Sequence, residues 1–204
     1  MVDWVVFDLG ETLVDETENW GRWADHLGVP RLTFAAALGA VIAGRRPHTD
    51  VFELLGASVD TSAVPWRVSA RDLYPDALPT LAALRTDGYR LAVMANQPAS
   101  VSPFLHSLPV DLVATSAEWG VAKPDPLFFE RVLSAVGAEA ARVAYVGDRV
   151  DNDVLPSKAA GMVAVHVRRG PWGVIQSAWP EASSADLRLA DLGGLVAGLA
   201  SLAR

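Results

Sequence analysis

The stretch at positions 5–13, which reads VVFDLGETL, decides the fold of this chain. Together with Trp4, its first three residues form an apolar run at 4–7 that is too short for an amphipathic helix. A glycine-containing turn follows, which predicts a buried strand of a parallel sheet. Asp8 ends that strand. Because open α/β sheets bind ligands at the carboxyl ends of their strands, we expect Asp8 to project into a site. Capping or turn formation would also explain an Asp here, so other segments must decide.

Length and composition favour one compact domain with a small insertion, since the chain has 204 residues, of which 51% are hydrophobic and 20% charged. The net charge of −7 and the scattered basic residues argue against nucleic acid or an anionic membrane as partner and favour a small molecule. No cysteine is present, which excludes disulfides and thiolate metal sites. The apolar stretches are too short to span a bilayer, and we expect a cytoplasmic protein.

The pattern along the chain changes near residue 74. Before it, helical spacing dominates 16–58, where Thr33 is a predicted cap for a helix at 34–42, and Asp50 with Glu53 a capping box for 51–55. After it, helix and strand patterns alternate, which predicts a doubly wound parallel sheet. The predicted strands there are 91–95, 112–114, 143–146 and 163–167, with helices that include 126–136, 153–160 and one in the tail at 185–203.

Two further segments carry polar groups that suit an anion. Asn96 and Gln97 follow the strand at 91–95 and precede a helix, and amide donors beside a helix N-terminus favour an anion, although simple capping explains them equally well. Lys123 lies in the proline-flanked loop at 120–126. It is one of only two lysines among 17 basic residues, which indicates a need for an ammonium group that can neutralise a phosphoryl oxygen or a carboxylate.

A cluster of carboxylates follows the strand at 143–146. Asp148, Asp151 and Asp153 crowd one loop, and helix capping explains Asp151 well but Asp148 poorly. Mg²⁺ prefers one or two carboxylates together with water and substrate phosphate. The loop is therefore a candidate magnesium site.

The order Asp8, Asn96, Lys123, Asp148, each after a predicted strand, resembles the haloacid dehalogenase-like hydrolase superfamily over nearly the whole chain. The resemblance implies an α/β fold with a doubly wound, Rossmann-like parallel sheet and a small α-helical cap insertion. Residues 1–14 and 74–204 would form the core domain, and residues 15–73 the helical cap that closes over the site and selects substrate.

The same resemblance implies a Mg²⁺-dependent phosphatase of a small phosphorylated metabolite. Asp8 would be the nucleophile that forms an aspartyl-phosphate, and Lys123 would orient and neutralise it. Candidate substrate-binding residues are Asn96, Gln97 and Glu11. The predicted magnesium ligands are Asp8, the Gly10 carbonyl, Asp148 and Asp153.

Two positions depart from the family pattern. Gly10 stands where family phosphatases usually carry a second Asp that acts as acid and base, a contribution of about 10²- to 10⁴-fold. Ala95 replaces the usual Ser or Thr. Glu11, or a substrate with a good leaving group, would compensate for Gly10. The departures also motivate a non-catalytic alternative, a phosphometabolite-binding or interaction module. A 2-haloacid dehalogenase is a lesser alternative.

Overall fold

The computed structural model describes residues 1–60 and 62–202, and within them six parallel strands form one sheet. The strand order β3-β2-β1-β4-β5-β6 confirms the predicted doubly wound α/β fold. Strand β1 lies between β2 and β4, at the point where the order in which strands are added to the sheet reverses. The strands are β1 (Trp4–Phe7), β2 (Arg90–Ala95), β3 (Leu112–Thr115), β4 (Val143–Gly147), β5 (Val163–Val167) and β6 (Leu187–Leu189).

Both faces of the sheet are covered by helices, because successive side chains of a strand point to opposite faces. Val5 and Phe7 of β1 belong to the apolar cluster that includes residues of α4 (Ala77–Thr86) and α10 (Leu195–Leu202). Trp4 and Val6 of the same strand belong to the cluster that includes residues of α7 (Pro126–Val136). The central strand is therefore buried on both sides, as the continuous apolar run predicts.

Helix α7 shows why the sequence at 125–137 folds locally as it does. The Asp125 carboxylate accepts a hydrogen bond from Leu127 N at 2.9 Å, Pro126 occupies the first turn, and Gly137 ends the helix with φ of 63°. The predicted bounds 126–136 are confirmed. The other helices around the sheet are α5 (Ser102–Leu105), α6 (Ser116–Trp119), α8 (Leu155–Ala159) and α9 (Gly170–Gln176).

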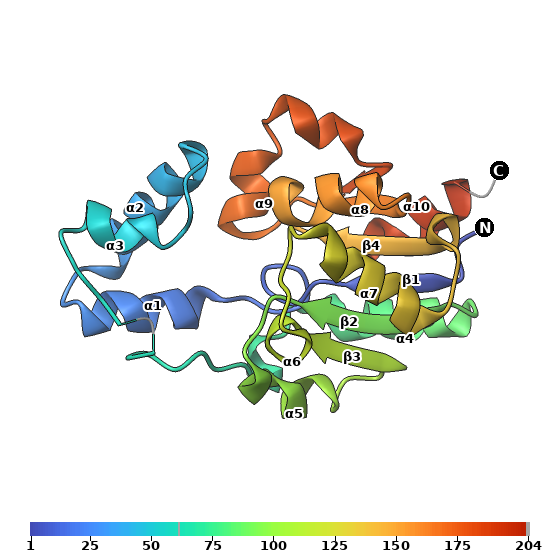
Figure 1. The fold of residues 1–204 in the computed structure, drawn as a ribbon, viewed down its shortest axis with the longest axis horizontal. Coiled ribbons are helices and arrows are strands. Elements are labelled where there is room, and N and C mark those ends of the chain that lie inside the picture. Colours follow the sequence, from blue (N-terminus) through green and yellow to red (C-terminus); the bar gives the residue numbers. More distant parts are fainter. Residues whose placement is uncertain (61, 203–204) are drawn as a thin grey trace.

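Three helices lie between β1 and α4: α1 (Thr17–His26), α2 (Arg31–Ala43) and α3 (Asp50–Leu54). In Figure 1 they form a separate group at the left, at the opposite end of the molecule from the chain's N-terminus. They share an apolar cluster of their own, built on side chains such as Trp23, Phe34 and Phe52. Trp172 of α9 joins this cluster, so the helical group also contacts the part of the chain that follows β5.

Two predicted helix caps are wrong. Helix α2 begins at Arg31 with Pro30 as the preceding residue, so Thr33 lies inside its first turn. Helix α3 begins at Asp50, so Thr49 holds the cap position and makes no side-chain cap, while the Asp50 carboxylate accepts a hydrogen bond from Arg46 Nε at 2.8 Å.

Two predicted helices differ in extent. The segment predicted as a helix at 153–160 begins with a π-helical turn over Val150–Val154 and continues as α8. The tail predicted as helical at 185–203 first forms β6, because Leu187 pairs with Val165 at the sheet edge, and only then α10. Residue 203, like residue 61 of the predicted insertion and residue 204, lies outside the described residues.

Within the described residues, no single helix has both the length and the apolar character needed to cross a bilayer. Only α1 and α2 taken together reach that length and composition, and they meet at 111°.

Candidate active site

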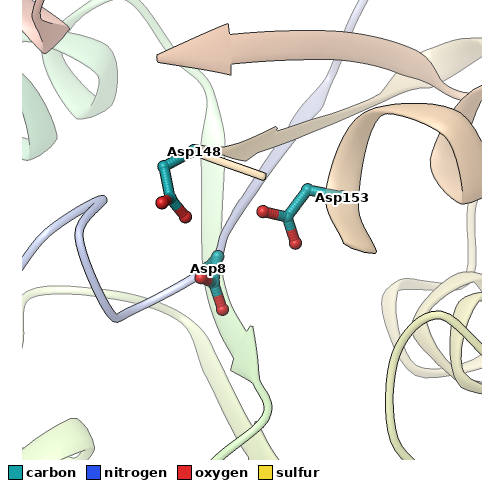
Figure 2. Close-up of side chains that lie close together, drawn as sticks. All are labelled: Asp8, Asp148 and Asp153. Carbon is teal, nitrogen blue, oxygen red and sulfur yellow. The ribbon is translucent and has the colours of Figure 1, made fainter. Parts of the chain in front are cut away.

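Three carboxylates converge at the carboxyl ends of two neighbouring strands (Figure 2). Asp8 follows β1, Asp148 follows β4, and Asp153 belongs to the π-helical turn that comes next. One ligand oxygen of each lies within 4.8 Å of the other two. The sheet fixes this geometry, since Asp8 N donates to Val146 O of the adjacent strand at 2.8 Å.

Gly147 allows Asp153 to fold back over the end of β4. A Cβ at Gly147 would lie 2.2 Å from Asp153 Oδ2, so any side chain there would displace the carboxylate. The same Oδ2 accepts a hydrogen bond from Arg149 N at 2.9 Å. The glycine before Asp148 is thus required by a close approach, and the turn after it holds Asp153 in place.

Lys123 lies between two of these carboxylates. Its Nζ is 2.6 Å from Asp8 Oδ1 and 2.6 Å from Asp153 Oδ1, and its side chain is almost fully buried. Burial alone would lower the pKa of Lys123, but the charges of Asp153 and Asp8 raise it well above its usual value. Lys123 therefore stays charged and orients the Asp8 carboxylate.

Asn96 fixes the loop that carries Lys123. Asn96 Oδ1 accepts from Lys123 N at 2.8 Å, and Asn96 Nδ2 donates to Lys123 O at 2.8 Å. The peptide bond between Lys123 and Pro124 is cis. Asn96 was predicted to bind substrate, and its amide lines the cavity, but both of its polar atoms already bind the lysine backbone.

The buried carboxylates repel one another. Burial and the nearby charges of Asp153 and Asp8 raise the pKa of Asp148 well above its usual value, and burial raises the pKa of Asp153 to about 6 although Lys123 opposes that shift. Asp148 Oδ2 is buried without a hydrogen-bond partner among the described residues. An oxygen-rich cluster with an unpartnered carboxylate oxygen has the chemistry that a hard divalent cation prefers.

A cavity of about 510 Å³ opens in front of these carboxylates, within the size range of small-molecule sites. One wall carries the charged residues just described. A second wall is aromatic, and its side chains come from α1, from the segments on either side of α3 and from α9. The lining includes Asp8, Gly10, Glu11, Glu16, Asn96, Gln97, Lys123, Asp148 and Arg149 together with Trp20, His48, Trp66 and Trp172.

Glu11 lies in the tight loop after β1, with φ of 52°. Its carboxylate accepts hydrogen bonds from Tyr74 Oη at 2.5 Å and from Glu16 N at 3.1 Å. Burial is the main cause that raises the pKa of Glu11. Both of its oxygens therefore help to fix the loop, one within it and one to Tyr74, and Glu11 lines the cavity.

A sequence model of the haloacid dehalogenase-like hydrolases matches residues 2–161. The chain belongs to this family. The match contains the strands that carry Asp8 and Asp148 and the loop of Lys123, the residues whose order carried the resemblance.

Relatives and solved structures agree with the family. The chain is 35% identical to glyceraldehyde 3-phosphate phosphatase of Methanopyrus kandleri in an alignment of 109 residues that covers 48% of this chain. It is 37% identical to phosphoserine phosphatase of Thermus thermophilus in an alignment of 127 residues that covers 59% of this chain. These matches span 45% and 48% of the two relatives, about half their length. The structure of L-2-haloacid dehalogenase from Xanthobacter autotrophicus has the same fold, with a TM-score of 0.71 at 19% identity, over 98% of this chain and 99% of that one.

Two residues of this haloacid dehalogenase-like hydrolase that line the cavity were not singled out from sequence. Glu16 is buried, and burial together with the charges of Glu11 and Asp8 raises its pKa well above the usual value. Arg149 holds Asp151 through two hydrogen bonds of 2.8 and 3.0 Å and lies over the Trp172 ring. An acid just before a helix resembles an ordinary helix-start residue, so the sequence signal that points to Glu16 is the missing side chain at Gly10.

Proposed function

We propose that this chain is a phosphatase that transfers the phosphoryl group of a small phosphorylated metabolite to Asp8 and then to water. One observation carries the proposal. Lys123 holds Asp8 Oδ1 at 2.6 Å, while Asp8 Oδ2 has no hydrogen bond to any described residue and belongs to a side chain that lines the cavity. An oriented carboxylate with one free oxygen next to a fixed cation has the features of an activated nucleophile.

The reaction follows from these contacts. Asp8 Oδ2 attacks phosphorus, the bond from phosphorus to the ester oxygen breaks, and the metabolite leaves with that oxygen. Lys123 offsets negative charge on the transferring oxygens. Asn96 holds the lysine loop so that Nζ stays in position. A water molecule then attacks the aspartyl-phosphate, which releases inorganic phosphate and restores the carboxylate.

The carboxylate cluster fits Mg²⁺. Asp8 and Asp148 would bind the ion together with the Gly10 carbonyl, and Asp153 would support it while it remains paired with Lys123. The bound ion supplies charge that stabilises the transferring phosphoryl oxygens. The unpartnered Asp148 Oδ2 supports this assignment.

The aromatic wall supports substrate selection by a helical cap at 15–73 over a core formed by 1–14 and 74–204. Trp20 and Trp66 line the cavity, and the indole Nε1 of each is buried without a hydrogen-bond partner among the described residues. A metabolite with hydroxyl or carboxylate oxygens beside its phosphate would accept from them. Gln97, which lines the same cavity, keeps its predicted role in binding substrate.

The named relatives support the class of substrate. Glyceraldehyde 3-phosphate and phosphoserine, the substrates in the names of the two relatives above, are small, oxygen-rich phosphate monoesters. The volume of the cavity accommodates a molecule of this kind.

The experiment that tests the proposal measures phosphate release from a panel of phosphate esters, sugar 1-phosphates and acyl phosphates, with and without Mg²⁺. Asp8→Asn should abolish turnover, and Asp15→Asn, which changes an exposed carboxylate seven residues further on, should not. Phosphate ligands that bind without turnover would favour the binding module instead. Chloride release from 2-chloropropionate would favour the dehalogenase.

A further inference from the structure

Gly10 leaves the loop after Asp8 without a side chain, yet the space beside it is filled. A Cβ built on Gly10 would lie 2.2 Å from Glu16 Oε1, 2.5 Å from its Cδ and 2.9 Å from Oε2. The Glu16 carboxyl group therefore occupies the place where a side chain of residue 10 would begin. Glu16 is six residues further along the chain, and the tight loop at 9–14 brings it back.

The backbone of Gly10 does not explain the glycine. Its φ lies outside the left-handed region that favours glycine, unlike that of Gly28 or Gly88, so an L-residue fits its conformation. What excludes a side chain is contact with Glu16. Gly10 and Glu16 thus form a complementary pair, in which the glycine makes room for the acid.

Two hydrogen bonds of Glu16 itself, and a third between Glu11 and Tyr74, fix this position. Glu16 N donates to Glu11 Oε1 at 3.1 Å, and Glu11 Oε2 accepts from Tyr74 Oη at 2.5 Å, which ties the loop to the segment before α4. Gln97 Nε2 donates to Glu16 Oε1 at 3.3 Å. The second oxygen, Oε2, has no hydrogen bond to a described residue, and the side chain lines the cavity that contains Asp8.

The other carboxyl groups on the charged side of the cavity each have another role. Asp8 and Asp153 are both paired with Lys123 at 2.6 Å, and both oxygens of Glu11 accept hydrogen bonds, from Glu16 N and Tyr74 Oη. Asp148 belongs to the cluster that fits a cation. Glu16 is the carboxyl group of this side that combines burial, a free oxygen and a position next to the nucleophile's loop.

We propose that Glu16 is the proton donor and acceptor of the reaction, an inference that rests on the proposed phosphatase function. As the bond from phosphorus to the ester oxygen breaks, the Glu16 carboxyl proton passes to that oxygen, and the metabolite leaves as a neutral alcohol. The resulting Glu16 carboxylate then removes a proton from the water that attacks the aspartyl-phosphate. Phosphate is released, and Glu16 is again a carboxylic acid.

The test compares leaving groups, because a proton donor matters only when the leaving oxygen needs the proton. The value of kcat/KM is measured for a series from 4-nitrophenyl phosphate through phenyl phosphate to an alkyl phosphate, since kcat/KM reports the steps up to phosphoryl transfer. Glu16→Gln should change kcat/KM little for 4-nitrophenyl phosphate and lower it by about 10²- to 10⁴-fold for the alkyl ester. Asp15→Asn is the matched control and should leave the whole series unchanged.

A compensating pair tests the geometry independently. Gly10→Asp alone should lose activity toward the alkyl ester, because its side chain collides with Glu16. In the double variant Gly10→Asp/Glu16→Ala, residue 10 instead of residue 16 supplies a carboxyl group to the same space. This variant should be more active toward the alkyl ester than Glu16→Ala. If this double variant does not fold, the leaving-group series of the isosteric Glu16→Gln decides alone.

The outcomes separate this inference from the function on which it rests. A uniform loss across the series in Glu16→Gln, or no loss at all, overturns the role of Glu16 while the phosphatase proposal stands. Absence of phosphate release by the wild-type protein from every compound of the series and of the panel, with Mg²⁺ present, overturns both.

Discussion

The two walls of the cavity are built in different ways. The charged wall, made of Asp8, Lys123, Asp148 and Asp153, comes from the ends of adjacent strands and from a loop fixed by Asn96, and its ion pairs measure 2.6 Å. The aromatic wall, made of Trp20, His48, Trp66 and Trp172, is held by ring contacts with centroids 5.4 to 6.3 Å apart. The sheet determines the first, and tertiary packing the second. The charged wall is suited to the reaction, and the aromatic wall to the choice of substrate.

The largest effect is expected from Lys123→Met, which would break the charged wall. It leaves Asp8 and Asp153 buried without their cation, and loss of one partner of a buried ion pair costs about 3–5 kcal/mol of unfolding free energy. Urea unfolding without metal measures the change. Lys158→Met is the matched control, since Lys158 is the chain's other lysine and pairs with Asp186 at the surface, where such pairs contribute about 1 kcal/mol or less. Equal losses in both variants would contradict the prediction.

Asn96→Ala tests whether the lysine loop must be held in register with Asp8. Both hydrogen bonds from the Asn96 side chain to the Lys123 backbone disappear, so Nζ is no longer fixed, and a displacement of about 1 Å can cost on the order of 10²-fold in rate. We expect kcat/KM to fall by about that factor. If only KM rises while kcat is unchanged, Asn96 acts on substrate binding, its originally predicted role.

Asp148→Asn should stabilise the metal-free protein at neutral pH, because the charged wall is arranged for a cation. The folded-state pKa values of Asp148 and Asp153 are raised, so the folded protein binds protons more tightly than the unfolded chain. The stability that these protons contribute is complete below the ordinary value of 3.8 and is lost as pH rises, through about 6 for Asp153.

Urea unfolding with EDTA between pH 5 and pH 8 measures the effect. The free energy of unfolding should fall less with rising pH in Asp148→Asn than in the wild type, and at pH 8 the variant should be about 1–2 kcal/mol more stable. Mg²⁺ should stabilise the wild type and have little effect on the variant. Identical pH dependence in the two proteins would show that the negative charge of Asp148 does not destabilise the metal-free protein.

The smallest effect is expected on the aromatic wall. Trp20→Phe and Trp66→Phe keep a ring but remove the unpartnered indole N–H. If each N–H donates to substrate, a net loss of about 0.5–1.5 kcal/mol per hydrogen bond raises KM by about 2- to 10-fold with kcat nearly unchanged. Trp119→Phe, a change at a tryptophan that is not among the cavity-lining residues, is the control. A fall in kcat as large as that of Asn96→Ala would erase the distinction between the two walls.

The charged wall was predictable because its residues stand in segments that follow the strands of the sheet. Asp8, Lys123 and Asp148 stand after short apolar runs or in a proline-flanked loop, and parallel strands bring such positions to one edge. The local signals of α7, an Asp cap, a first-turn Pro and a terminal Gly, likewise agree with the fold. Where the local preferences of a segment agree with the overall fold, its structure can be predicted from the sequence.

The rest depended on contacts between segments distant in sequence. Strand β6 is not predictable from its own three residues, because they acquire strand structure only by pairing with β5. Glu16 carries no motif, and its position emerges only from the contact with Gly10. Trp172 packs against the helical group although it lies more than a hundred residues later in the sequence, and no periodicity within that group reveals this contact.

The indole group of Trp20 has an optical consequence. Its ring lies 5.4 Å from that of Trp66 and 5.8 Å from that of Trp172, and all three line the cavity, out of seven tryptophans in the chain. At such separations excited-state energy passes readily among indoles, so the three emit as a coupled group. A ligand that enters the cavity changes the surroundings of this group first, and the native protein thereby carries an unlabelled fluorescent and near-ultraviolet circular dichroism reporter of occupancy.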